Sequence, residues 1–198
     1  MTTTTLLPRT TTAVADAIRG IDRLDPTAPT PCEQFDAVAL INHFVGTVGA
    51  LARIGRGEPL DPENPWGQGG DAAAGPWQRR LADGLDQLGA AWADERAWAG
   101  SIDFGSGEMT AAQTGRMAFG EALLHGWDLT RAAGTTLTVP DDVGAALYEF
   151  VAETGELGRS MGAYGPAVPV AEDRTAFHRA LGLAGRDPDW TPDGPGPA

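Results

Sequence analysis

Three side chains that can hold a metal ion or move a proton lie close together in the stretch "FGEALLHGWDL", residues 119–129. Glu121, His125 and Asp128 are spaced four and then three residues apart, so an α-helix brings them to one face. Apolar residues share that face, which predicts that the three polar groups point towards the core. A buried polar group without a partner is costly, and a divalent metal ion is one way to satisfy all three.

A glutamate and a histidine one helical turn apart can direct an oxygen and a nitrogen at one point, as metal sites in helical bundles do. A third ligand must come from a facing helix, and only His43 and His178 remain. His43 lies near the apolar face of an amphipathic segment, whereas His178 lies among charged residues in "RTAFHRAL". We therefore predict a site of His43, Glu121 and His125. These two neutral ligands and one anionic ligand would leave a zinc ion an open position for water or substrate.

Ordinary structural roles remain alternatives for these residues. A glutamate and a histidine at this spacing often form only a hydrogen-bonded pair on a helix surface, and His43 can be a satisfied core histidine. Asp128 can bond to nearby backbone, or it can orient His125 through a hydrogen bond without touching the metal. Cys32, the single cysteine, is interpreted as a packing residue, because no histidine lies near it in the sequence.

Helices are the elements predicted to position these side chains. Apolar spacing and end signals predict helices from Thr12 to Leu24, from the cap Asp36 to about Leu51, from Pro76 to Trp92, between the cap Thr110 and Gly134, from Pro140 to about Gly155, and over residues 176–183. Thr110 and Gln113 suit a capping box, and Phe35 and Leu40 suit a hydrophobic staple. The Gly- and Pro-rich stretch 55–76 is predicted to be a long loop that could border the site. The expected fold class is all-α, a four-helix bundle with additional short C-terminal helices.

Composition and charge narrow the function classes. The formal net charge is −13, from 14 Lys and Arg against 27 Asp and Glu, and no basic cluster occurs, so no nucleic-acid partner is expected. No run of about 18 apolar residues and no signal-peptide pattern occurs, so we expect no membrane span and a cytoplasmic location. We divide the chain into a metal-binding bundle over residues 1–160 and a C-terminal extension over residues 161–198 that packs on it and has an irregular end.

Three motifs in combination resemble a known family. They are "TPCEQFDAVALINHFVG" (residues 30–46), "GEALLHGWDLTRAAG" (120–134) and "GRDPDW" (185–190). The chain is similar in them to the actinobacterial metal-binding family related to the N-terminal domain of mycothiol-dependent maleylpyruvate isomerase. That family belongs to the DinB-like four-helix superfamily, so the resemblance implies a DinB-like bundle.

The family pattern implies a zinc ion on a histidine of the second helix and on a Glu-x-x-x-His pair of the fourth, which here are His43, Glu121 and His125. Two features differ from the family. Phe35 stands where members often have tryptophan, which we expect to change only packing. The isomerase also has a second domain, whereas only 64 residues follow Gly134 here, so maleylpyruvate is not the expected substrate.

Our leading hypothesis is a mycothiol-dependent S-transferase or isomerase that acts on a small electrophile, in which zinc holds the thiol as a thiolate. An alternative enzyme keeps the metal as a Lewis acid on a carbonyl, as a cyclase or isomerase of secondary metabolism would, and needs no thiol. A metal-binding protein without catalytic activity is the third possibility.

Overall fold

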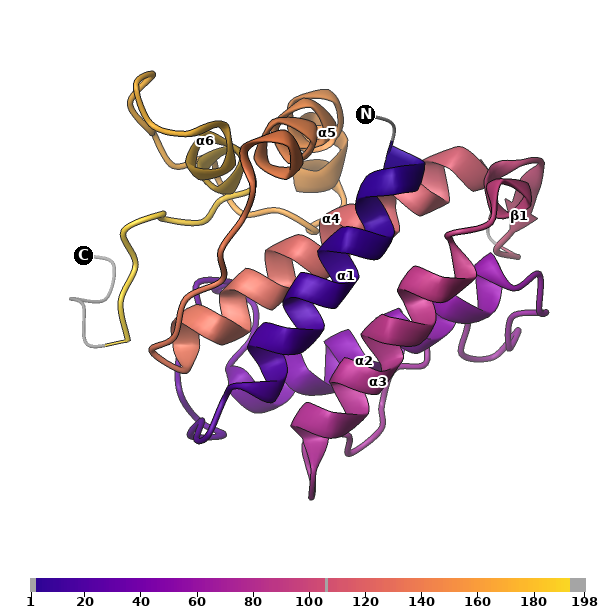
Figure 1. Cartoon of the computed structure of the whole chain (residues 1–198), viewed down its shortest axis with the longest axis horizontal. Helices are drawn as coiled ribbons and strands as arrows, with labels where there is room; N and C mark the ends of the chain where they lie inside the picture. The colour runs from indigo at the N-terminus through magenta and orange to yellow at the C-terminus, as the bar shows by residue number, and fades with distance from the viewer. Residues whose placement is uncertain (1–2, 106, 193–198) are drawn as a thin grey trace.

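The structure, a computed structural model, describes residues 3–105 and 107–192. Its elements in chain order are α1 (Thr3–Arg19), α2 (Ala37–Gly55), α3 (Trp77–Ala91), the 3-10 helix η1 (Glu95–Trp98), β1 (Ser101–Asp103), β2 (Glu108–Thr110), α4 (Ala111–Ala132), α5 (Asp141–Ser160) and α6 (Ala176–Leu183). Helices α1 and α2 each pack against both α3 and α4, which makes a four-helix bundle (Figure 1). The fold is the expected all-α, DinB-like bundle with additional C-terminal helices.

The predicted capping residues begin the two helices that carry the candidate ligands. Asp36 Oδ1 accepts a hydrogen bond from Ala39 N at 2.9 Å, at the start of α2. At the start of α4, Thr110 Oγ1 accepts from Gln113 N at 3.2 Å, and Gln113 Oε1 accepts from Thr110 N at 3.1 Å. Gly134 follows the helix with φ of 69°, a conformation that favours glycine. Local sequence signals therefore set the ends of α4 and the start of α2.

The predicted span of the first helix is wrong at both ends, because α1 begins at Thr3 and ends at Arg19. A run of threonines and Pro8 lowers the helix propensity of the first turns, so the sequence pattern did not predict that these turns are helical. Leu6 and Leu7 are nevertheless buried there, so packing in the core outweighs the local preference. A glycine directly after Arg19 breaks the helix before the remaining apolar residues.

Two further helices follow the bundle. α5 extends five residues beyond the predicted end, to Ser160, and α6 covers the predicted span 176–183. They pack chiefly against each other and lie beside α4 (Figure 1). The division into 1–160 and 161–198 stays a prediction, and the expected irregular end falls mostly on residues 193–198, outside the described residues.

The stretch 56–76 is an irregular loop, as expected, and it lies along α2. Gln68 Nε2 donates to Thr47 Oγ1 at 3.1 Å, and Ala73 N donates to Asn42 Oδ1 at 2.9 Å. The loop therefore contacts α2 on both sides of the candidate histidine ligand along the chain. Between α3 and α4 along the chain, β1 and β2 form an antiparallel pair of short strands.

By length and composition alone, α2 is the one helix among the described residues that could cross a membrane. In this structure 56% of that helix is buried inside the protein, where it packs against α3 and α4. A buried core helix of a helical bundle can be as long and as apolar as a helix that crosses a membrane, so this test is weak evidence for a membrane span. The expected lack of a membrane partner thus stays a prediction.

Candidate metal centre

The structure brings the three predicted ligands together between α2 and α4. Glu121 Oε2 lies 3.5 Å from Nε2 of His43 and 3.5 Å from Nε2 of His125. The two imidazole rings meet edge to face, with centroids 5.0 Å apart. One ligand atom from each residue lies within 4.8 Å of the other two. The spatial grouping that the spacing predicts is present, and its role in holding a metal stays a prediction.

The central oxygen of this group lacks a hydrogen bond. Glu121 Oε2 is buried and, among the described residues, has no hydrogen-bond partner, because both histidine nitrogens lie within ion-pair distance but without hydrogen-bond geometry. An unsatisfied buried polar atom costs about 1–3 kcal/mol. A divalent cation between the three atoms would satisfy all of them, and a His₂Glu set is a donor set that zinc accepts in enzymes. The residues present therefore fit the metal that the motifs imply.

The ionisation of Glu121 suits the same role. Burial raises the pKa of the Glu121 carboxyl. The interactions with His125, then with His43 and Arg186, together lower the pKa by a larger amount, so it lies below the ordinary value. Glu121 is consequently an anion at neutral pH. A carboxylate must be deprotonated to bind a metal ion, so no proton has to leave this residue when a metal binds.

The centre opens to solvent on one side. The side chains of His43 and Glu121 are 25% and 26% exposed, whereas that of His125 is 8% exposed. Phe35, expected to affect only packing, stacks on the ring of His43 with centroids 4.9 Å apart and lies edge-on to His125. Phe35 therefore packs against the rings of both candidate histidine ligands.

The other nitrogen of His125 is already hydrogen-bonded. Asp128 Oδ2 lies 3.0 Å from His125 Nδ1, so of the two alternatives for Asp128 the bond to His125 is present. Asp128 is fully buried and is paired with Arg186, whose Nη2 donates to Oδ2 at 3.1 Å. Burial raises the pKa of Asp128, but Arg186 and then His125 lower it below its ordinary value. Asp128 is an anion that accepts from Nδ1–H and leaves Nε2 of His125 as the nitrogen with a free lone pair.

Cys32, interpreted from the sequence as a packing residue, is buried and lies beside His125. Its sulfur, a nitrogen of His125 and an oxygen of Asp128 lie within 4.8 Å of one another. Burial raises the pKa of the Cys32 thiol from 9.0 to about 11, so the thiol is protonated at neutral pH. Asp128 already bonds to His125 Nδ1 and to Arg186, so the polar groups of this second cluster have partners without a metal ion.

Two side chains near the centre were not found from the sequence. Arg186 is buried and comes from the C-terminal segment, 58 residues after its partner Asp128. Its one sequence signal was its place in the "GRDPDW" motif. Tyr164 lies close enough for Glu121 and Arg186 to influence it, although burial is the largest reason that its pKa is raised. His178, rejected as a ligand, lies in α6, where its Nδ1 is 3.0 Å from Thr175 Oγ1.

The family model described as "Mycothiol maleylpyruvate isomerase N-terminal domain" matches residues 7–130. This span holds most of the four-helix bundle, including the three clustered ligands and Asp128, and it ends before Arg186. No curated protein matches the chain. No solved structure matches it either.

Proposed function

The chain belongs to the mycothiol maleylpyruvate isomerase N-terminal domain family, and from this premise we propose that it is a zinc-dependent enzyme that uses a low-molecular-weight thiol. By family analogy the thiol is mycothiol. The reaction we propose is S-transfer to a small electrophile, or its isomerisation through a reversible thiol adduct. One observation carries the proposal: a buried, unbonded carboxylate oxygen of Glu121 lies 3.5 Å from an imidazole nitrogen of His43 and 3.5 Å from one of His125, in a group whose His43 and Glu121 side chains are partly exposed.

In this proposal His43, Glu121 and His125 hold the metal ion. Two neutral imidazoles and one carboxylate leave a divalent ion a net charge of about +1, which favours an anionic fourth ligand. When bound, zinc would lower the pKa of a coordinated thiol from about 8.5 and so supply a thiolate at neutral pH. The exposed fractions of His43 and Glu121 support access for a small molecule from that side.

Asp128 and Arg186 act on His125 rather than on the substrate. Asp128 accepts the Nδ1 hydrogen of His125, which fixes the ring orientation and directs Nε2 towards Glu121. Arg186 neutralises Asp128 inside the protein, so this carboxylate neither takes the proton of His125 nor competes for the metal. Both residues are therefore positioning residues.

Cys32 is not the thiol that reacts. It is buried, its pKa is about 11, and it lies near Asp128, which already bonds to Nδ1 of His125. A protein with an internal nucleophile would keep that thiol exposed and its pKa low. An external thiol that reaches the accessible side of the centre fits these facts better.

Cobalt substitution tests the proposal. In Cys32→Ser protein loaded with Co²⁺, mycothiol should produce a sulfur-to-cobalt charge-transfer band, and S-methylated mycothiol should not. The Cys32→Ser change removes the one internal sulfur that could mimic the signal from a cysteine. Thiolate binding releases a proton, so apparent affinity should rise between about pH 6 and pH 8.

Two results would contradict the proposal in different ways. Failure of the protein to retain cobalt would remove the metal centre itself. Retained cobalt without a mycothiol band at any of these pH values would remove the thiol and leave the Lewis-acid alternative, in which the metal polarises a substrate carbonyl.

A further inference from the structure

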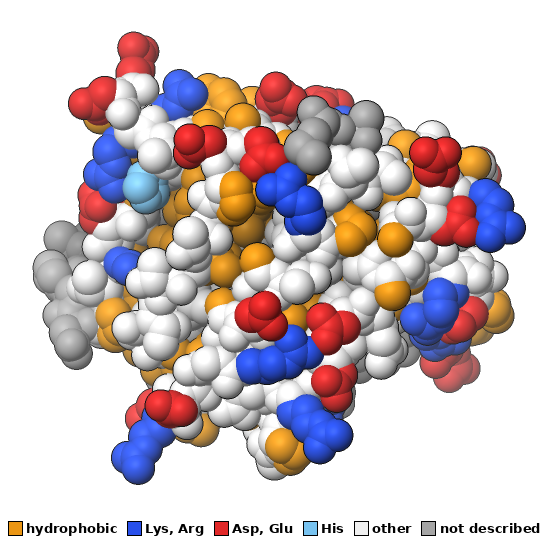
Figure 2. Space-filling model, viewed as in Figure 1, with side chains coloured by type: hydrophobic (Ala, Val, Ile, Leu, Met, Phe, Trp, Pro, Cys, Tyr) orange, Lys and Arg blue, Asp and Glu red, His pale blue; other side chains and the backbone are white. Residues whose placement is uncertain are grey.

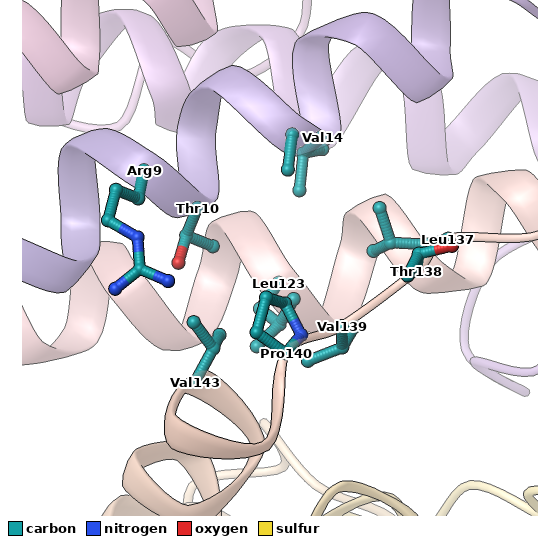
Figure 3. Close-up of a pocket in the computed structure, with 10 residues that line it drawn as sticks. Arg9, Thr10, Val14, Leu123, Leu137, Thr138, Val139, Pro140 and Val143 are labelled. Carbon is teal, nitrogen blue, oxygen red and sulfur yellow. The ribbon is translucent and has the colours of Figure 1, made fainter.

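Residues 136–140, in the segment that joins α4 to α5, line two separate hollows. Figure 3 shows the smaller one, where Thr10 and Val14 of α1 face Leu123 of α4 and Pro140 of the segment. It encloses about 50 Å³, enough for one or two water molecules and too little for a metabolite. The hydroxyl of Thr10 is buried there without a partner among residues 3–105 and 107–192, which suits an ordered water.

The larger hollow, here called the α4–α6 pocket, lies between the C-terminal part of α4 and the first turns of α5 and α6. Its volume of about 650 Å³ falls in the range of small-molecule sites, roughly 300–1,000 Å³. Trp127, Pro140 and Phe177 supply apolar walls, while Arg131 and His178 supply polar groups. One face of the protein, drawn in Figure 2, carries a histidine with charged side chains around it and hydrophobic side chains nearby.

Arg131 has unused capacity to bind an anion. Its Nη2 donates to Trp190 O, and its guanidinium carbon lies 5.9 Å from the ring centroid of Trp127. Its Nε is buried without a partner, and no carboxylate within the described part of the chain lies at ion-pair distance from it. The nearby Asp189 is held by Arg174 at 2.8 Å. In a chain with 27 acidic and 14 basic residues, an arginine without an ion pair beside a hollow is a candidate anchor.

Other groups in the pocket restrict the charge of the ligand. His178 uses Nδ1 towards Thr175 Oγ1, and its Nε2 contacts no hydrogen-bond partner in the described ranges. Burial, with Arg174 and Arg131, lowers the pKa of His178, so at neutral pH it offers a neutral hydrogen-bonding group. Asp141 also lines the pocket and would repel a second negative charge.

We propose that the α4–α6 pocket binds a small monocarboxylate with an apolar, aromatic body. Its carboxylate would pair with the guanidinium of Arg131, a donor fork that matches the geometry of a carboxylate. Its body would lie against Trp127 and Phe177, whose rings contribute apolar area and aromatic contacts. Trp127 and Arg131 lie one turn apart on a different face of α4 from the metal cluster, so this site goes beyond the proposed function and does not depend on it.

A nuclear magnetic resonance titration of the full-length ¹⁵N-labelled protein tests this site. Benzoate, its uncharged analogue benzamide and inorganic phosphate are added separately at constant pH and ionic strength. We expect saturable shifts of the Trp127 indole N–H and of the backbone of residues 175–178 with benzoate. Benzamide should bind at least about tenfold more weakly, because it lacks the charge that Arg131 recognises.

Matched variants separate the pocket from the metal centre. Arg131→Gln should weaken benzoate binding by at least about tenfold, whereas Arg116→Gln, which removes an arginine from the other end of α4, should not. Ala145→Phe should also weaken binding, because Ala145 is exposed and lines the pocket, so a larger side chain fills space without disturbing the core. Glu121→Ala, which disables the metal cluster, should leave benzoate binding unchanged.

Several outcomes would overturn the proposal. These are the absence of saturable benzoate binding, equal binding of benzamide, unchanged binding by both Arg131→Gln and Ala145→Phe, or shifts confined to residues around the metal cluster. Saturable phosphate binding without benzoate binding would show that the pocket is not a carboxylate site.

Discussion

The two ring nitrogens of His125 face two groups that contain similar ligand atoms. The groups differ in burial and in whether their polar atoms are hydrogen-bonded. On the Nε2 side, Glu121 and His43 are partly exposed, and their converging atoms make no hydrogen bond with one another. On the Nδ1 side, Asp128 is fully buried and bonds to both His125 and Arg186. Each group would pass a test based on distance alone. A candidate metal site is therefore better recognised by lone pairs left free than by the proximity of ligand types.

One residue accounts for most of this difference. Helix α4 places one carboxylate a turn before His125 and a second carboxylate a turn after it. The helix alone therefore does not distinguish the two sides of His125. Arg186, from the C-terminal segment, bonds directly to Asp128, whereas it acts on Glu121 only through its charge at a distance. The experiments below test whether this asymmetry determines where a metal binds.

The largest effect is expected from removing a candidate ligand. Glu121→Ala or His43→Ala should lower metal affinity by more than about 100-fold, beyond the loss caused by removing an outer hydrogen-bond partner. His178→Ala and Cys32→Ser should retain affinity, since His178 lies outside the group of His43, Glu121 and His125 and Cys32 belongs to the separate group with Asp128. Competition with a chromophoric chelator measures these affinities. Loss of metal in Cys32→Ser with retention in Glu121→Ala would assign the centre to the other side of His125.

Removal of Arg186 should lower both the stability of the protein and its metal affinity. Arg186→Met leaves the buried carboxylate of Asp128 without its cation, which should lower the free energy of unfolding by about 3–5 kcal/mol. Urea unfolding measures this change. Metal affinity should also fall by about 10- to 100-fold, because Asp128 would take up a proton or shift its bond to His125.

Two controls accompany this prediction. Arg174→Met breaks an exposed ion pair with Asp189 and should cost no more than about 1 kcal/mol. The double variant Asp128→Asn/Arg186→Met removes both charges and should recover part of the lost stability. Equal stability of Arg186→Met and Arg174→Met would show that the buried pair does not matter to folding.

Metal removal should have a moderate effect on stability. A metal present at about 100 times its dissociation constant stabilises the native state by about 2.7 kcal/mol. Chelation should therefore lower the free energy of unfolding by this amount, and the melting temperature should fall with it. The helical circular-dichroism signal should persist below the transition, because the bundle buries its own apolar core. Glu121→Ala protein should not respond to the chelator. A fully unfolded apo-protein would identify the centre as structural.

The smallest effect concerns Cys32 and the stability at high pH. Its pKa rises from 9.0 to about 11 on folding, so the folded state holds this proton more tightly. The resulting stability is present below about pH 9 and is lost as pH rises towards 11, by up to about 2 kcal/mol. Wild-type protein should therefore lose more stability than Cys32→Ser across this window. Parallel losses in urea unfolding would show that the thiol ionises as easily when folded.

Much of the grouping of His43, Glu121 and His125 could be predicted because its signals are local. Glu121 and His125 lie one turn apart, and the caps Asp36 and Thr110 mark the helices that carry them and His43. Helical spacing then determines which side chains share a face. The same local logic identified the four helices of the bundle.

Non-local contacts explain what was missed. Cys32 meets His125 only through the packing of the segment before α2, and Arg186 meets Asp128 across 58 residues. Neither pairing leaves a periodic pattern in the sequence. The early start of α1 was missed for a related reason, since burial of Leu6 and Leu7 outweighs the weak helix propensity of the residues around them.

The segment 186–190 links parts of the protein that could otherwise diverge independently. Arg186 bonds to Asp128, Pro188 lines the α4–α6 pocket, and the carbonyl of Trp190 accepts from Arg131. A recombination event that exchanged this C-terminal segment alone would leave an uncompensated charge inside the bundle. The segment and the end of α4 must therefore be inherited together, or change by compensating substitutions, even though the family match ends at residue 130.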